Sequence, residues 1–381
     1  MKKRVLFYCQ SLLGIGHFIR SRELLFALRD FEVCFLYGGE AVPGFNWPDW
    51  VEVVYLPALR SDTAFENLYV VGSQTSLEEV QAQRKELLLA TFDRFSPDIL
   101  LIELFPFGRK KFNFELLPLL TRARETRPEL KIVCSLRDIL VRRASQAKYE
   151  AEVCQRMNQF FDLLLVHADP RVQLLEETFG SVAKLRCQIR YTGYVAQPPQ
   201  LSAAANDATE PLILVSIGGG RVGHELISCT LAASPLLTFP HRLQIFTGPH
   251  ISEDQFAQLQ TLAAALPNAK LQRHTTEFPA WLRRSALSIS MAGYNTCMDI
   301  LAAQARALVY PFTEHDNDEQ TRRARKLEQL GFVTMLEPER LSPEFLASEI
   351  TRLLTVTTAP PTPPIDLRGA ERTAELLTAL L

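Results

Sequence analysis

Short apolar runs alternate with helical patterns along almost the whole chain, and this alternation constrains the fold more than any other feature of the sequence. Runs typical of strands are found at residues 5–9, 33–37, 51–56, 99–103, 131–136 and 163–167, and again at 212–217, 243–247, 269–273, 286–290, 307–310 and 333–336. Helical patterns in the first half lie between them, at 17–28, 77–95, 114–124 and 144–160. Strands that alternate with helices form parallel sheets, so we expect an α/β fold with doubly wound sheets.

Two domains are expected, because 381 residues exceed the length of one ordinary domain. Residues 196–210 lack a periodic apolar face and contain many turn formers, which is typical of a linker. The predicted division is a first domain at 1–195, a second domain at 211–365 and a final helical segment at 366–381.

Composition argues against several classes of protein. The net charge of -2 and the pI of ≈ 6.4 give no positive field that would recruit nucleic acid. No apolar run approaches the ~20 residues that span a bilayer, and the N-terminus lacks the features of a signal peptide, so a cytoplasmic protein is expected. The seven cysteines are scattered without a Cys-x-x-Cys pair, and the histidines follow no metal-binding spacing. We therefore expect neither a metal site nor a resident cofactor.

A small-residue turn in the second half carries the most chemistry. Ala292 and Gly293 follow a predicted strand, and a helix is expected to start near Tyr294 and Asn295. A glycine lets the backbone approach a phosphate, and the helix start directs N–H groups and the positive end of its dipole at it. Ligands of open α/β sheets bind in this place. The alternative is a purely structural turn, which an isolated glycine usually marks.

The spacing of polar residues after this turn favours binding. Asp299 lies about one and a half turns into the predicted helix, a reach suited to a ribose diol. After the strand at 307–310, a loop crowded with carboxylates and amides ends at Glu319 and Gln320, which are candidates for contacts with sugar hydroxyls.

These residues resemble the nucleotide-sugar half of GT-B glycosyltransferases, above all the group containing the N-acetylglucosaminyltransferase that makes lipid II. In that group an acidic residue lies six positions after the glycine, and a Pro-Phe turn leads to a loop ending in Gln. Gly293 and Asp299 keep this spacing, Pro311-Phe312 and Gln320 follow, and the loop here is slightly longer. The resemblance implies two Rossmann-like domains facing a cleft, a C-terminal helix that crosses back to the first domain, and a nucleoside diphosphate sugar donor, UDP-linked.

A second glycine-containing loop follows the first predicted strand. Gly14 and Gly16 permit a close approach or a positive φ, and His17 comes next, at a helix start. The helix dipole disfavours an imidazolium there, which keeps the ring neutral and able to accept a proton. The resemblance implies that a histidine in this turn is catalytic or positions substrate, so His17 is a candidate general base. The alternative is a histidine that caps the turn.

The first strand of the second domain also ends in glycines. Gly218, Gly219 and Gly220 make a backbone anion nest plausible, and Arg221 would add charge. The resemblance assigns this turn to the donor diphosphate and places Phe278 near the nucleobase. The alternatives are a tight strand-to-helix connection and a core phenylalanine.

Two carboxylates of the first domain are expected to face the cleft. Asp138 follows the strand at 131–136 and is predicted as a partner or reserve base for His17, or else as a helix N-cap. Glu103 ends the strand at 99–103 and has a similar ambiguity. The basic residues 109–111, beside several apolar ones, predict either a weak contact with an anionic membrane or lipid-linked acceptor, or a solvated helix start over the core.

The prediction is a metal-independent glycosyltransferase that uses a nucleotide-sugar donor, with a small-molecule or lipid-linked hydroxyl acceptor. Inversion at the anomeric carbon is implied by the resemblance alone. Two alternatives stay open: a nucleotide-sugar 2-epimerase of the same architecture, and a non-catalytic protein that binds a nucleotide sugar.

Overall fold

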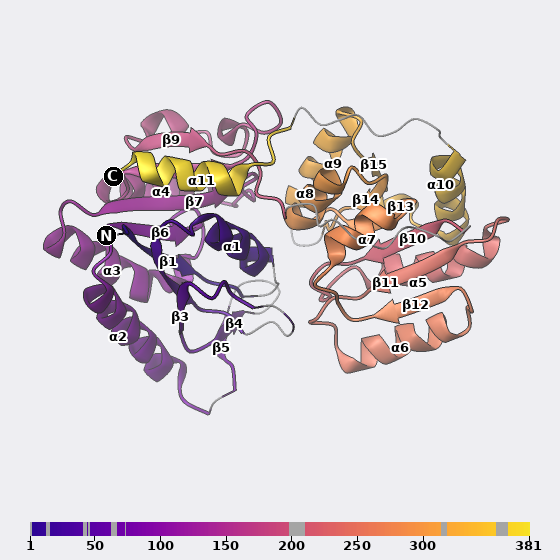
Figure 1. Cartoon of the computed structure of the whole chain (residues 1–381), viewed down its shortest axis with the longest axis horizontal. Coiled ribbons are helices and arrows are strands. Elements are labelled where there is room, and N and C mark those ends of the chain that lie inside the picture. The colour runs from indigo at the N-terminus through magenta and orange to yellow at the C-terminus, as the bar shows by residue number, and fades with distance from the viewer. Residues whose placement is uncertain are drawn as a thin grey trace.

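The chain forms two α/β domains that stand side by side (Figure 1). The computed structural model describes residues 2–12, 16–40, 44, 46–61, 67–72, 74–197, 210–313, 318–355 and 365–381. Gly14, residues 198–209 of the predicted linker and residues 314–317 of the predicted acidic loop lie outside this described part.

The first domain is built on a seven-stranded parallel sheet. Its main strands are β1 (Arg4–Cys9), β2 (Glu32–Tyr37), β3 (Val51–Tyr55), β6 (Ile99–Glu103), β7 (Lys131–Arg137), β8 (Leu163–His167) and β9 (Gln188–Tyr191). They lie in the order β3-β2-β1-β6-β7-β8-β9, so the strand order reverses between β1 and β6. The helices are α1 (Gly16–Ala27), α2 (Leu77–Phe95), α3 (Asn113–Thr126) and α4 (Gln146–Phe160), and β4 (Leu59–Ser61) pairs with β5 (Leu68–Val70) in a small antiparallel ribbon.

The second domain repeats this plan with a six-stranded parallel sheet. Its strands are β10 (Leu212–Ser216), β11 (Arg242–Phe246), β12 (Ala269–Gln272), β13 (Leu287–Met291), β14 (Ala307–Tyr310) and β15 (Thr334–Met335). The order β12-β11-β10-β13-β14-β15 reverses between β10 and β13. The helices are α5 (His224–Ala233), α6 (Glu253–Ala264), α7 (Phe278–Arg284), α8 (Tyr294–Ala303), α9 (Glu319–Gln329) and α10 (Pro343–Thr355).

The inner strands of both sheets are buried on both faces, whereas the outer strands β3, β9 and β12 keep exposed residues. In β1, β6 and β10 almost every residue is inaccessible to solvent, and α-helices cover both sides of each sheet. Parallel strands with such burial read as continuous apolar runs, and this is why the sequence located them to within a residue or two.

The predicted elements differ from the structure in three places. The strand predicted at 286–290 is β13, shifted by one residue, and residues 278–284 before it form the helix α7, which the sequence pattern did not indicate. Glu319 and Gln320 are not loop residues; they are the first two residues of α9. The strand β9 and the two strands of the β4–β5 ribbon, three or four residues each, are too short to stand out in the sequence.

The last helix, α11 (Gly369–Ala379), crosses back to the first domain. It packs on α1, and its Leu377 is buried in the apolar core beneath β1 and β2 (Figure 1). The chain is fixed where it returns by a bridge between Val195 and Arg368 and by the bond from Gly369 N to Tyr194 O, 2.9 Å. Within the described residues, the helices are too short or too polar to cross a membrane.

Candidate functional site

In each sheet the strand order reverses at one point, and these two points face each other across the domain boundary. His17 lies at the start of α1, after β1, and Glu103 is the last residue of β6. Gly218 and Gly293 lie in the turns after β10 and β13. Ligands of doubly wound sheets bind at this reversal, outside the carboxyl ends of the strands. A cavity of ≈ 400 Å³ lies between the domains here.

Most of the predicted site residues line this one cavity. They are Gly16, His17, Gly218, Gly219, Phe278, Gly293, Tyr294, Asn295, Asp299, Glu319 and Gln320. Asp138, Gly220, Arg221 and Ala292 lie outside its lining, and the predicted Gly14 falls outside the described residues.

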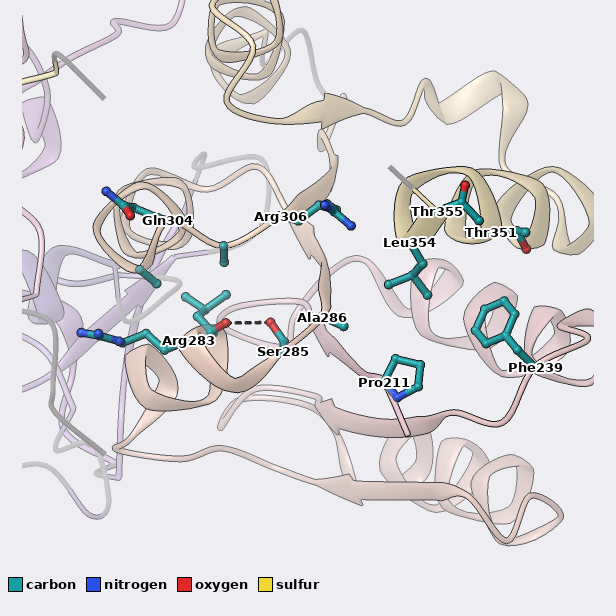
Figure 2. Close-up of a pocket in the computed structure, with 13 residues that line it drawn as sticks. Pro211, Phe239, Arg283, Ser285, Ala286, Gln304, Arg306, Thr351, Leu354 and Thr355 are labelled. Carbon is teal, nitrogen blue, oxygen red and sulfur yellow. Dashed lines mark hydrogen bonds between the residues drawn. The ribbon is translucent and has the colours of Figure 1, made fainter. Parts of the chain in front are cut away.

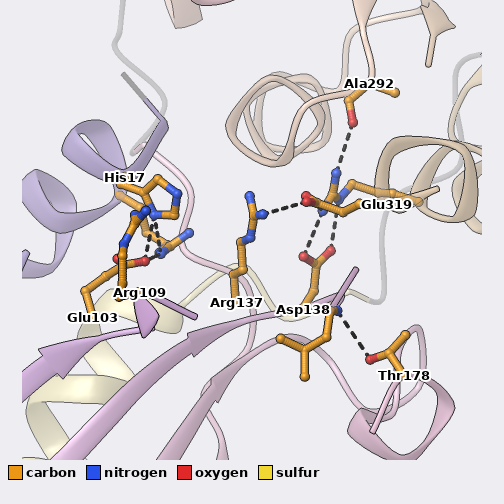
Figure 3. Close-up of polar contacts among 11 residues, drawn as sticks. His17, Glu103, Arg109, Arg137, Asp138, Thr178, Ala292 and Glu319 are labelled. Atoms are coloured by element: carbon orange, nitrogen blue, oxygen red, sulfur yellow. Dashed lines mark hydrogen bonds and ion pairs between the residues drawn. The ribbon is translucent and has the colours of Figure 1, made fainter. Parts of the chain in front are cut away.

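His17 forms a hydrogen-bonded pair with Glu103 at the cavity wall (Figure 3). Its Nδ1 lies 2.7 Å from Oε1 of Glu103, whose side chain has no solvent exposure. The same carboxylate pairs with Arg20, one helical turn after His17, and its second oxygen lies 3.4 Å from Arg109 Nη2. Within the described part of the chain, the contacts of His17 are made through Nδ1, so the ring can offer Nε2 to the cavity.

The surroundings keep the imidazole neutral. Burial, together with the nearby charges of Arg109 and Arg20, lowers the pKa of His17 to about 3 although Glu103 opposes the change. Burial would raise the pKa of Glu103, but the attraction of its basic neighbours outweighs this and lowers it. An ionised Glu103 accepts a hydrogen bond from the protonated Nδ1 of His17. This bond fixes the tautomer in which Nε2 carries no proton and can accept one.

The glycine turns of the second domain offer backbone to the cavity. Gly220 has a φ of +89°, and a Cβ there would lie 2.5 Å from the carbonyl oxygen of Thr247, so no other residue fits. Gly293 is different, because its φ of −64° suits any residue and a Cβ would meet nothing within 4 Å. The absence of a side chain at Gly293 therefore keeps the cavity open in front of the first N–H groups of α8, which have no acceptor within the helix.

Asp299 lies one and a half turns along α8, as predicted, and its side chain is almost fully buried at the cavity wall. Its Oδ2 is 3.5 Å from Nε2 of Gln197, at the start of the interdomain connection. Burial raises the pKa of Asp299 to about 8, with a smaller contribution from Glu23. The carboxyl group is therefore largely protonated near neutral pH, which lets it both donate and accept hydrogen bonds.

Glu319 and Gln320 belong to the start of α9, where helix geometry fixes their directions. Glu319 accepts from Arg323 one turn later at 2.7 Å and from Arg137 of the first domain at 2.6 Å. Gln320 accepts from the N–H of Phe312 at 3.1 Å through Oε1, so its NH₂ group is the part left for a ligand.

Asp138 is not the partner of His17, contrary to the sequence prediction. Its buried carboxylate makes two bonds to Arg323 of α9, 2.8 and 2.9 Å long, across the domain boundary (Figure 3). The reason is the strand order: β6, which ends in Glu103, lies next to β1, whereas β7, which precedes Asp138, lies one strand farther away. Asp138 thus joins the domains, and its assignment as a base is not supported by this geometry.

The basic residues 109–111 do not share one surface, because the two lysines are exposed and the side chain of Arg109 is buried. Phe112 and Leu116 after them are fully buried in the core, Lys110 pairs with Glu152, and Arg109 turns into the cavity. Arg221 lies near Glu40 and Arg60 of the first domain rather than in the cavity wall, and burial lowers its pKa.

Sequence reasoning missed the cationic side of the site. Arg20 and Arg137 both line the cavity, Arg20 as part of the histidine network and Arg137 through Glu319. The spacing of His17 and Arg20, three residues apart on one helix, was the available signal.

A second cavity of ≈ 630 Å³ lies at the opposite edge of the second sheet, where β10, β13 and β14 begin (Figure 2). Its lining includes Pro211, Ser285 and Arg306, and the bond drawn there joins Ser285 to the carbonyl of Leu282 at 2.8 Å. The adjoining segments at 198–209 and 356–364 lie outside the described residues, and the cavity is remote from the strand ends where the predicted residues meet.

Comparison with known proteins agrees with this layout. Residues 213–367 match the glycosyltransferase family 28 C-terminal domain. The calicheamicin glycosyltransferase CalG4 aligns over 100% of this chain and 99% of its own, with a TM-score of 0.61 and 17% identity. The chain has the GT-B fold. A putative UDP-N-acetylglucosamine 2-epimerase from Listeria monocytogenes shares the architecture, with a TM-score of 0.65, 14% identity and coverage of 100% and 96%.

Sequence relatives point to the group named from the motifs. The UDP-N-acetylglucosamine--N-acetylmuramyl-(pentapeptide) pyrophosphoryl-undecaprenol N-acetylglucosamine transferase of Lactiplantibacillus plantarum is 24% identical over 152 residues. The match covers 40% of this chain and 42% of that protein, so it spans less than half of the relative. The second domain of this chain is thus similar to the C-terminal domain of glycosyltransferase family 28, and the whole chain shares the GT-B fold.

Proposed function

We propose that this GT-B protein transfers a sugar from a nucleoside diphosphate sugar, UDP-linked, to a hydroxyl acceptor. One observation carries the proposal: the His17–Glu103 pair faces the Gly218 and Gly293 turns across a single cavity. One wall thus offers a group that can accept a proton, and the other offers a place for a diphosphate.

The donor would bind the second domain. The N–H groups at the start of α8 and of the turn at Gly218 to Gly220 would hold the diphosphate. Asp299 would bind the ribose hydroxyls, and Gln320 with Glu319 would contact the sugar. Phe278 lines the same cavity near Phe246, which favours a stacking or edge contact with the base.

The chemical step follows from these positions. Nε2 of His17 accepts the proton of the acceptor hydroxyl as its oxygen forms a bond to the anomeric carbon. The bond from that carbon to the β-phosphate oxygen breaks, and the electron pair leaves with the diphosphate. The positive end of α8 stabilises the departing anion, so a metal ion is not part of the proposal. A single displacement of this kind inverts the anomeric carbon.

The first experiment is a calorimetric titration with UDP, TDP, GDP and ADP without added metal. Selective binding of UDP is expected, because the proposal depends on a uridine-based donor. Binding of a different nucleotide would change the donor, and binding of none, with or without magnesium, would overturn the proposal.

The second experiment tests the chemistry. Substituting His17→Ala should leave UDP affinity unchanged and remove sugar transfer to water or to a screened acceptor, because only the proton acceptor is lost. Unchanged turnover would exclude His17 as the base. Proton NMR of the donor incubated without acceptor tests the alternative, since a change of configuration at the sugar C2 would identify a 2-epimerase.

A cytoplasmic location is part of the same proposal. All seven cysteines lie in the described part of the chain and carry free thiols, as expected for a reducing compartment.

A further inference from the structure

The first-domain wall of the cavity is unusually cationic. Among its described lining residues, three are arginines, Arg20, Arg109 and Arg137, and none is a carboxylate. Arg20 and Arg109 are almost fully buried, with side-chain exposures of 2% and 5%, and Arg137 retains 25%. Placing guanidinium groups in such a position is costly unless anions balance them.

The carboxylates around the wall do not balance these charges. Together with Arg323, four guanidinium groups meet three carboxylates, those of Glu103, Asp138 and Glu319 (Figure 3). Asp138 and Glu319 bond closely to Arg323 and Arg137, and the close partner of Arg20 is Glu103.

Of these four arginines, Arg109 has the weakest pairing with a carboxylate. Among the described residues, its one ion pair is the 3.4 Å contact with Glu103, a carboxylate that His17 and Arg20 already share. Its buried Nε has no hydrogen-bond partner among the described residues. A guanidinium in this state has donors free for a further anion, and its planar fork suits a carboxylate or a phosphate.

We propose that Arg109, assisted by Arg137, binds an anionic group of the acceptor, a carboxylate or a phosphate near the reacting hydroxyl. This rests on the proposed function, because it assigns the acceptor to the first domain and the donor to the second. The side of the cavity decides between the two substrates: the diphosphate would lie at the glycine turns, whereas Arg109 lines the first-domain side, against Glu103.

The same contact would influence the base. After burial, the charge of Arg109 contributes most to lowering the pKa of His17. An acceptor anion on Arg109 would offset that charge and make Nε2 a stronger proton acceptor. Acidic acceptors would then be favoured twice, through binding and through activation of His17, and neutral acceptors would meet a weak base.

Inorganic phosphate is a suitable probe, measured by calorimetry on protein saturated with UDP so that the diphosphate site is filled. Phosphate should still bind the wild type, and Arg109→Met should weaken it by about tenfold or more, as expected for a charge-assisted bond. Arg142→Met is the matched control, because Arg142 is an exposed arginine of the same domain. Arg109→Lys keeps the charge without the fork and should give an intermediate loss.

Two results would overturn the proposal. If UDP abolishes phosphate binding to the wild type, the arginines serve the donor. If Arg109→Met binds phosphate as the wild type does, Arg109 holds no anion. If UDP itself fails to bind, the proposed function fails, and the comparison of Arg109→Met with wild type in phosphate alone still decides whether the anion site exists.

A spectroscopic readout separates this role from a structural one. In ¹⁵N-histidine-labelled protein, phosphate should move the titration of His17 to higher pH in the wild type and leave it unchanged in Arg109→Met. Titration of His17 that ignores phosphate in the wild type would exclude the link between acceptor charge and the base.

Discussion

At the scale of single residues, the histidine depends on a buried carboxylate. Glu103→Gln should lower turnover by about a hundredfold or more while leaving UDP affinity unchanged, because the tautomer and orientation of His17 are no longer fixed. The change also leaves Arg20 and Arg109 without their anion, so a loss of stability of about 3 kcal/mol is expected. Steady-state kinetics and denaturant unfolding measure the two effects.

The control for this substitution is Glu371→Gln, which makes the same chemical change at an exposed position of α11. If Glu103→Gln keeps full turnover while losing stability, the carboxylate is structural only and the histidine needs no orienting partner.

Asp299 gives a prediction that depends on pH. Burial lifts its pKa from 3.8 to about 8, so in this window the folded state holds a proton that the unfolded chain has released. The free energy of unfolding must therefore fall as pH rises through the window, by an amount on the order of 1 kcal/mol per pH unit.

Asp299→Asn cannot lose this proton, so its stability relative to wild type should rise as pH increases from 4 to 8. Urea unfolding of both proteins at several pH values measures the difference. A difference that does not vary with pH would mean that Asp299 is ionised in the folded protein at all these pH values.

The single residues also show what sequence could and could not predict. The positions of His17, Gly293 and Asp299 follow from local spacing, and all three line the cavity. Local spacing does not decide whether Glu103 or Asp138 is the partner of His17, because this depends on which strand lies beside β1 in the sheet. Sheet order is a property of long-range packing, and neither strand differs locally in a way that encodes it.

At the scale of elements, α8 is the part of the fold that serves both the cavity and the domain contact. Its first residue, Tyr294, donates its hydroxyl to His167 O at 3.1 Å and accepts from Val195 N at 2.9 Å, and Asn295 donates to Gly16 O at 2.9 Å. The helix start is thus fixed against the first domain while its N–H groups face the cavity.

Gly293→Ala tests the use of that helix start. The backbone there suits alanine and the added methyl meets no protein atom, so thermal stability should stay within about 1 kcal/mol of wild type. UDP affinity should fall by about tenfold or more, because the methyl lies where the ligand approaches. Gly180→Ala is the matched control, since its φ is not positive and its added Cβ makes ordinary contacts at 3.6 Å. Unchanged UDP affinity in Gly293→Ala would mean that no ligand approaches this turn.

The largest error in the predicted elements concerns α9, whose first residues were predicted to lie in a loop. Its hydrophilic sequence reads as a continuation of the acidic loop, because few of its residues are apolar. The burial of Glu319 and Arg323 at its start comes from ion pairs with the first domain rather than from an apolar face. A pattern based on hydrophobicity cannot detect a helix that is buried through charge.

At the scale of the whole molecule, three ion pairs of α9 cross the domain boundary among the described residues, and two of them, Arg323–Asp138 and Lys326–Glu177, lie in different surroundings. Arg323 and Asp138 are almost fully buried, with side-chain exposures of 2% and 0%, whereas Lys326 and Glu177 retain 26% and 41%. Solvent screens the second pair, so Lys326→Met should cost no more than about 1 kcal/mol of stability.

Arg323→Met should cost about 3–5 kcal/mol, because it leaves Asp138 buried without its cation and removes one of the two arginines that pair with Glu319. It should also loosen the contact between the domains, since the pair of Arg323 with Asp138 joins the second domain to the first. Denaturant unfolding measures the cost, and small-angle X-ray scattering should show a larger radius of gyration for Arg323→Met than for Lys326→Met. Equal costs for the two substitutions would mean that burial does not strengthen the first pair, and an unchanged radius would mean that α11 and the contacts of Tyr294 are sufficient to hold the domains together.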